Sequence, residues 1–228
     1  MRHHFENSSW LVSDVSLKSL LDKIQEELRK KEEIRDEVQR DMRRATRLSK
    51  QAILFAHQER FNDARKLLEE AKELFAKLGQ VSKDHPDLVY TGLVNAAFEE
   101  YAEAHTLFKL ITENRFTDPK ELDIPAVSYV LGLADVIGEL RRRALDLLRK
   151  GDVKTAEDCL QRMEHIYVEL MAMDDAYLLV PGLRRKCDVA RRIIEATRGD
   201  ITIETRRSSL ERSIKELEKV VERKRKVG

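Results

Sequence analysis

The sequence predicts an all-α fold, a single domain of seven helices that opens with a very long one. Three observations support this prediction. The 228 residues include only 8 glycines and 4 prolines, and neither type occurs before Gly79, which leaves too few turn residues for most all-β architectures. Apolar residues recur at intervals of three and four along most of the chain. The hydrophobic fraction of 42% is that of an ordinary globular protein and excludes general disorder.

The first predicted helix covers residues 13–61. Ser13 and Asp14 are suitable N-caps for its first turn. A helix of this extent is about 70 Å long, so it needs partners along its length from the same chain or from another. Its helically spaced apolar residues are Leu17, Leu20, Leu21, Ile24, Leu28, Ile34, Val38, Met42, Leu48 and Ala52.

Glycine, proline and capping residues divide the rest of the chain. Gly79 is expected to end the second helix, and a turn containing Pro86 follows it. Gly151 is expected to end the fourth helix, and Gly199 the sixth. The six helices predicted after the first cover residues 61–78, 88–114, 126–150, 152–173, 181–199 and 202–226.

We therefore expect an N-terminal extension (1–14), a helical domain (15–200) and a charged C-terminal helix (201–228). Between Thr205 and Gly228 there are nine basic and four acidic residues. This segment has two readings, a nucleic-acid-binding arm or a coiled-coil-like helix that packs on the domain or on an oligomer partner. The second is favoured, because basic residues at a helix C-terminus also complement the helix dipole.

Charge and cysteine content exclude several classes of protein. The 43 Lys and Arg residues nearly balance the 42 Asp and Glu residues, unlike in a strongly basic nucleic-acid binder. Cys159 and Cys187 lack metal-ligand spacing and are expected to be packing residues in a reducing cytoplasm. No run of 18 apolar residues is present, so we expect no membrane span and a cytoplasmic location.

Two pairs of acidic residues stand out on consecutive predicted helices. Glu100 and Glu103 are neighbours on one helix face, and neither has a basic residue three or four positions away. Asp135 and Glu139 form a second like-charge pair, opposite the apolar stripe of their helix.

Spacing alone favours solvated helix faces for these pairs, and the alternative is that the four carboxylates converge. Their mutual repulsion would then be relieved by a divalent cation, for which oxygen ligands suit Mg²⁺ or Mn²⁺ rather than zinc. Such a cation can activate water for phosphodiester cleavage. No phosphate-binding glycine loop, zinc motif or serine nucleophile motif is present, and His57, His105 and His165 are interpreted as packing or surface residues.

Basic clusters occur on the first, fourth and sixth predicted helices. Most such clusters are solvated faces that balance local acids, but converging clusters would form a surface for a nucleic-acid backbone. The candidate RNA-binding residues are Arg43, Arg44, Arg47, Arg142, Arg143, Arg184, Arg185, Lys186 and Arg192.

Specific segments resemble the translin family. These are EEYAEA at 99–104 and SYVLGLADVIGEL at 128–140, and the segments at 151–152, 186–191 and 198–199 are also similar. The likeness covers about residues 20–200 and is closer to the translin-associated factor X (TRAX) branch, in a compact form similar to the archaeal single-subunit versions. The basic, histidine-containing stretch of translin has no counterpart at 88–98.

The resemblance implies an all-α subunit of a hollow homo-oligomer, an octamer, that encloses RNA. It also implies a Mg²⁺-dependent endoribonuclease, in which Glu100, Glu103 and Asp135 bind the metal and Glu139 binds it or orients a water. Mn²⁺ is an alternative cation and DNA an alternative ligand. The competing functional hypotheses are a non-catalytic RNA- or DNA-binding oligomer and a structural helical adaptor.

Overall fold

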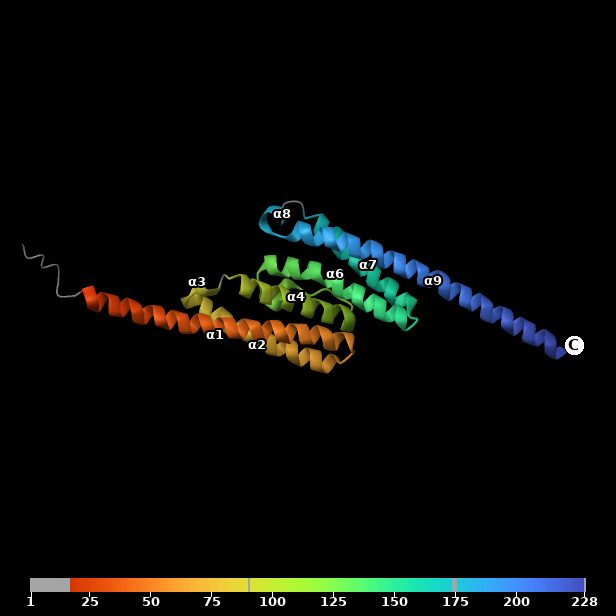
Figure 1. Ribbon diagram of the computed structural model, residues 1–228, viewed down its shortest axis with the longest axis horizontal. Coiled ribbons are helices and arrows are strands. Elements are labelled where there is room, and N and C mark those ends of the chain that lie inside the picture. Colours follow the sequence, from red (N-terminus) through yellow and green to blue (C-terminus); the bar gives the residue numbers. More distant parts are fainter. Residues whose placement is uncertain (1–16, 90, 174–175, 228) are drawn as a thin grey trace, which may run out of the picture.

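The structure is a computed structural model that describes residues 17–89, 91–173 and 176–227 (Figure 1). These residues form helices and no strand, which confirms the predicted all-α class. Six helices are long and three are single turns. The long helices are α1 (Leu17–His57), α2 (Phe61–Asp84), α4 (Gly92–Thr112), α6 (Ala126–Arg149), α7 (Val153–Met171) and α9 (Leu183–Val227). The single turns are α3 (Pro86–Val89), α5 (Pro119–Leu122) and α8 (Ala176–Leu179).

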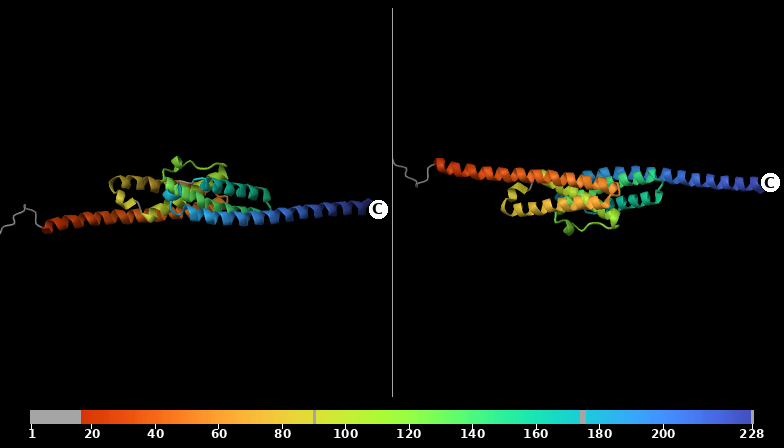
Figure 2. Two further views of the ribbon diagram at one scale, coloured as in Figure 1. Left: turned by 90° about the horizontal axis from the view of Figure 1, so that it is seen from above. Right: turned by 90° about the horizontal axis from the view of Figure 1, so that it is seen from below.

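The long helices pack as three successive pairs. The α1–α2 hairpin lies on one side, α4 and α6 form the middle, and α7 and α9 lie on the other side (Figures 1 and 2). The apolar core is continuous through all three pairs, from Met42 on α1 through Leu107 and Leu140 to Met163 on α7, all of which are fully buried. The two middle helices therefore have neighbours on both sides.

Two predicted helix ends are wrong, because tertiary burial outweighs the helix-breaking tendency of glycine. Gly79 lies inside α2, which continues to Asp84 and packs Leu78 and Val81 on the core. Gly199 lies inside α9, where the nearby Thr197 and Ile201 are buried. A glycine within a helix costs about 1 kcal/mol relative to alanine, which is less than the gain from burying one large apolar side chain. The predicted sixth and seventh helices are thus one helix.

The middle pair approaches very closely at Gly132. A Cβ atom on this residue would lie 2.5 Å from the backbone oxygen of Glu99 and 2.7 Å from the Cβ of Ala102. Only a residue without a side chain fits there, so this glycine sets the separation of α4 and α6. The four candidate carboxylates are carried by these two helices next to this contact.

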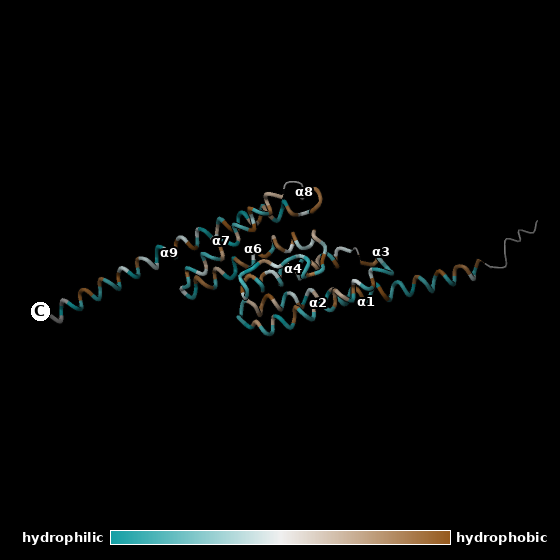
Figure 3. The backbone as a smooth tube through the Cα atoms, turned by 180° about the vertical axis from the view of Figure 1, so that it is seen from behind, coloured by the Kyte–Doolittle hydropathy of each residue, from teal (hydrophilic) through white to brown (hydrophobic). Residues whose placement is uncertain are grey.

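The outer ends of α1 and α9 extend beyond the bundle in opposite directions (Figure 2). Both arms carry apolar residues that are at least 46% exposed. These residues colour parts of the backbone tube brown (Figure 3). They are Leu17, Leu20, Leu21, Ile24 and Leu28 on α1, and Ile203, Leu210, Ile214, Leu217, Val220 and Val221 on α9. The predicted caps Ser13 and Asp14 and the 1–14 extension lie outside the described residues.

Candidate metal centre and nucleic-acid interface

The two acidic pairs face each other across the α4–α6 contact. Thr91 caps the start of α4, accepting a hydrogen bond from the Val94 backbone, and the buried Ala97, Tyr101 and Ala104 fix which face of this helix points inward. On α6, buried Val136, Ile137 and Leu140 do the same. The four acidic residues lie between the buried and exposed faces, so they are partly buried.

Glu103 lies at the electrostatic centre of the group. The pKa of its carboxyl is raised to about 8, mainly by burial and also by the negative charges of Asp135, Glu100 and Glu139, against a smaller opposing effect of Lys186. Within the described residues, Glu103 is also the one of the four carboxyls with no hydrogen bond or ion pair. The structure therefore brings the four predicted residues into one electrostatic cluster, with an unpartnered carboxyl at its centre.

Each of the other three carboxylates contacts a lysine or histidine side chain from a helix other than its own. Lys50 Nζ on α1 lies 3.3 Å from Glu100 Oε1. His57 Nε2, also on α1, lies 2.6 Å from Glu139 Oε2, and Arg142 is 3.6 Å from the same oxygen. Because an ionised carboxylate can only accept, the Nε2 atom of His57 carries the shared proton.

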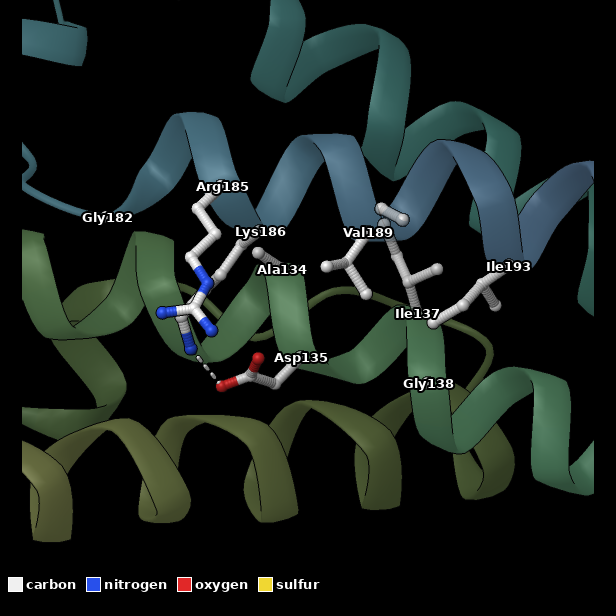
Figure 4. A pocket seen from close by; sticks show the side chains of 10 residues that line it. Ala134, Asp135, Ile137, Gly138, Gly182, Arg185, Lys186, Val189 and Ile193 are labelled. Carbon is white, nitrogen blue, oxygen red and sulfur yellow. Dashed lines mark hydrogen bonds and ion pairs between the residues drawn. The ribbon is translucent and has the colours of Figure 1, made fainter.

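Lys186 on α9 makes the third contact. Its Nζ atom lies 2.5 Å from Asp135 Oδ2 (Figure 4). The same atom is 3.4 Å from Glu99 Oε2. Burial alone would lower the pKa of Lys186, but the hydrogen bond to Asp135 and the nearby carboxylates raise it, so this ammonium group stays charged. The hydrogen bond from His57 is the main reason that the pKa of Glu139 is lowered.

The donor set suits a hard cation, although its side chains are held apart by these contacts. All four groups are carboxylates, the ligand type preferred by Mg²⁺ and Mn²⁺. No three metal-ligating side chains in residues 17–89, 91–173 and 176–227 are already gathered around one point. Binding a cation would therefore require the carboxylates to turn from Lys50, His57 and Lys186 toward Glu103.

The predicted basic residues are only partly brought together. Lys186 and Arg142 contact the cluster, and Arg185 lies beside Lys186 (Figure 4). Arg44 instead pairs with Glu70 on α2, Arg43 donates to Gln39, and Arg192 donates to the backbone oxygen of Asp188. The remaining residues are Arg47 and Arg184, which are exposed, and Arg143, which is half-buried.

Sequence reasoning missed Lys50 and Glu99 and interpreted His57 as a packing or surface residue. His57 is indeed 4% exposed, but it also contacts a candidate metal ligand. A signal was present on α1, because Arg43, Arg47, Lys50 and His57 recur at helical spacing and share one face. That face lies against the cluster at Lys50 and His57.

The other two histidines have structural surroundings. His105 shares a hydrogen bond with Thr117, and burial lowers its pKa to about 4, while His165 packs against Phe116. Cys159 and Cys187 are buried free thiols, as expected for packing residues. In the part of the chain that the structure describes, no helix is both long and apolar enough to cross a lipid bilayer.

These observations define an all-α bundle whose two central helices hold a partly buried acidic cluster bordered by basic residues. The Translin family matches residues 33–221. Uncharacterized protein MJ0175 of Methanocaldococcus jannaschii is 36% identical over 176 residues, which cover 76% of this chain and 78% of that protein. The chain belongs to the translin family.

Solved structures show the same fold. The structure of an AfC3PO–duplex RNA complex has a TM-score of 0.73 and 33% identity, covering 81% of this chain and 96% of that one. The crystal structure of AfC3PO has a TM-score of 0.74 and 34% identity over the same shares. The structure of apo-NeC3PO has a TM-score of 0.74 and 29% identity, covering 83% of this chain and all of that one.

Proposed function

We propose that this protein is a TRAX-like, metal-dependent endoribonuclease that acts as a homo-oligomer. The observation that supports this most directly is the cluster of four carboxyls around Glu103, whose pKa is raised to about 8 in the absence of a cation. Such a cluster costs folding free energy, and a divalent cation is the ligand that would recover it. The cytoplasmic location expected from the sequence is part of this proposal.

RNA is the substrate favoured by the surroundings of the cluster. A related AfC3PO structure contains duplex RNA. In this chain, Lys50, Arg142, Arg185 and Lys186 border the carboxylates, so a phosphate backbone approaching the cluster meets positive charge first. Recognition through phosphates and shape suits RNA, and DNA is the alternative ligand.

The chain's own residues have separate roles in this mechanism. Glu100, Glu103, Asp135 and Glu139 would hold the cation, and His57 orients Glu139 through its Nε2 hydrogen bond. Bound there, Mg²⁺ or Mn²⁺ supplies Lewis-acid activation of water and of the phosphodiester. Lys50 and Lys186 pair with Glu100 and Asp135 in the structure, and they would become available to phosphate oxygens if those carboxylates turned toward a cation. Glu103 must lose its proton for the cation to bind.

The arms support the oligomeric part of the proposal. Leu17, Leu21, Ile24 and Leu28 follow the alternating spacing of four and three residues that is typical of a coiled-coil seam. Leu210, Ile214, Leu217 and Val221 on α9 do the same, and Leu210 is 62% exposed. Contacts between copies would bury these stripes, and the octamer implied by the family resemblance is the assembly that we propose.

A cleavage assay tests the catalytic assignment. A labelled single-stranded RNA is incubated with the protein in Mg²⁺, Mn²⁺ or EDTA, and RNA binding is measured in parallel by fluorescence anisotropy. We expect cation-dependent cleavage that falls at least about 100-fold in Glu103→Gln and Asp135→Asn while RNA binding is retained. Glu169→Gln, an exposed acid on α7, is the matched control and should cleave normally.

The runner-up function is a non-catalytic RNA- or DNA-binding oligomer. Binding without cleavage by the wild-type protein would establish that alternative, and the absence of both would favour a structural adaptor. Equal cleavage by the wild-type protein and the two cluster variants would refute the assignment of the site.

A further inference from the structure

A pocket of about 400 Å³ opens between α6 and α9, directly beside the carboxylate cluster (Figure 4). Its wall is largely apolar, formed by Ile137 on α6 and by Val189 and Ile193 on α9. Gly138 and Gly182 contribute no side chain, so part of the space exists because these residues are small. The volume lies within the range of about 300–1,000 Å³ that is typical of small-ligand pockets.

One end of the pocket is polar and charged. Asp135 and Lys186 lie there, and the guanidinium of Arg185 points toward the same place (Figure 4). In the described chain the Arg185 guanidinium has no carboxylate partner, in contrast to Lys186. A planar guanidinium without a partner is well suited to two hydrogen bonds with a phosphate. The pocket thus matches a ligand that joins an apolar part to an anionic group.

Asp135 belongs to both the pocket and the carboxylate cluster. A phosphodiester held at the cluster therefore places the adjoining nucleotide at the pocket entrance. An RNA base has a flat apolar face, and RNA-binding proteins commonly hold unstacked bases against such surfaces.

We propose that the pocket between α6 and α9 binds one unstacked nucleobase of the RNA strand, with Arg185 contacting its phosphate. This inference rests on the proposed nuclease function and extends it with a base-binding subsite. The base lies against Ile137, Val189 and Ile193 and is held by shape and apolar contact. The subsite positions the strand, and the base that it holds must be unpaired.

Gly138→Leu tests the subsite by filling it. A Cβ atom at Gly138 has no other atom within 4 Å, so the backbone accepts the change and the longer side chain extends into the pocket. Gly199→Leu is the matched control, because it places the same substitution on an exposed helical glycine of α9 that also has free space. Circular dichroism checks that both variants fold. Val189→Glu is a second variant that places a charge in the apolar wall, and it should be tolerated because Val189 is 41% exposed.

The substrate is a single-stranded oligoribonucleotide, compared with the same strand in which one residue lacks its base. We expect the wild-type protein to cleave about tenfold more slowly next to the abasic residue. Gly138→Leu should cleave the intact strand about tenfold more slowly and no longer distinguish the two strands. Gly199→Leu should behave like the wild-type protein.

Several outcomes would overturn the subsite. Cleavage by the wild-type protein that is insensitive both to the abasic residue and to Gly138→Leu refutes it while leaving the nuclease intact. If the wild-type protein does not cleave at all, the nuclease proposal fails, and anisotropy in EDTA decides the subsite by comparing the affinities for the two strands. If Gly138→Leu changes the mass measured by light scattering and the loss of RNA binding follows that change, the pocket is occupied by a second copy of the chain.

Discussion

Replacing the ionisable carboxyl of Glu103 with a neutral amide should make the protein more stable in EDTA. The unfolded chain releases the Glu103 proton near pH 4.5, whereas the folded protein keeps it until about pH 8. Folding therefore takes up a proton between these values, so the free energy of unfolding falls as pH rises, by about 1.4 kcal/mol per pH unit from this group. Glu103→Gln lacks this loss and should be more stable than the wild-type protein by about 3 kcal/mol at pH 7.

Urea unfolding followed by circular dichroism in EDTA, at several values between pH 4 and 9, measures this difference. The stability gap between Glu103→Gln and the wild-type protein should be near zero below pH 4.5, widen up to pH 8 and then stay constant. Glu169→Gln, the exposed control, should give a curve parallel to that of the wild-type protein. If the stability curves of Glu103→Gln and the wild-type protein run parallel between pH 5 and 8, the raised pKa of Glu103 is refuted. The more stable variant is also the one expected to lose cleavage, as is common for strained functional sites.

Three further predictions concern packing, positioning and the arms. Gly132→Ala should lower the free energy of unfolding by about 1–3 kcal/mol, because the new Cβ meets the backbone of α4. Gly79→Ala, where a Cβ has free space, should raise it by about 0.5–1 kcal/mol. Equal effects of the two variants in urea unfolding would contradict the close contact at Gly132. His57→Ala should raise the pKa of Glu139 toward its ordinary value, since the hydrogen bond from His57 is its main depressant, and an unchanged carboxyl titration by NMR would refute this role. Deleting residues 209–228, whose described side chains are exposed, should change the stability of the bundle by less than about 0.5 kcal/mol but reduce assembly in sedimentation; a destabilised bundle would show that the arm packs on its own domain.

The long helices could be predicted because helical spacing of apolar residues is a local signal. Their ends could not be predicted equally well, since Gly79 and Gly199 are helix breakers only when the flanking turns have nothing to bury. Leu78 and Ile201 are buried in the folded protein. Local sequence patterns do not show which residues tertiary packing will bury.

Spacing alone could predict only that the acidic residues form like-charge pairs, and it favoured solvated helix faces for them. Spacing showed that Glu100 and Glu103 lack basic neighbours on their own helix, which is a local property. Their compensation is not local, because Lys50 is 50 residues from Glu100 and Lys186 is 51 residues from Asp135. The packing of α1 and α9 against the middle helices creates these contacts, and only the folded structure shows them.

The contacts made by Lys50, His57 and Lys186 have a consequence for how the protein matures. Three of the four carboxylates already have partners from within the chain, so the polypeptide can reach its folded form before any ion arrives. If the proposed cation is the cofactor, synthesis and metal acquisition become separate events. A cell short of that ion would then accumulate a folded but inactive population, which could be activated without new translation once the ion returned.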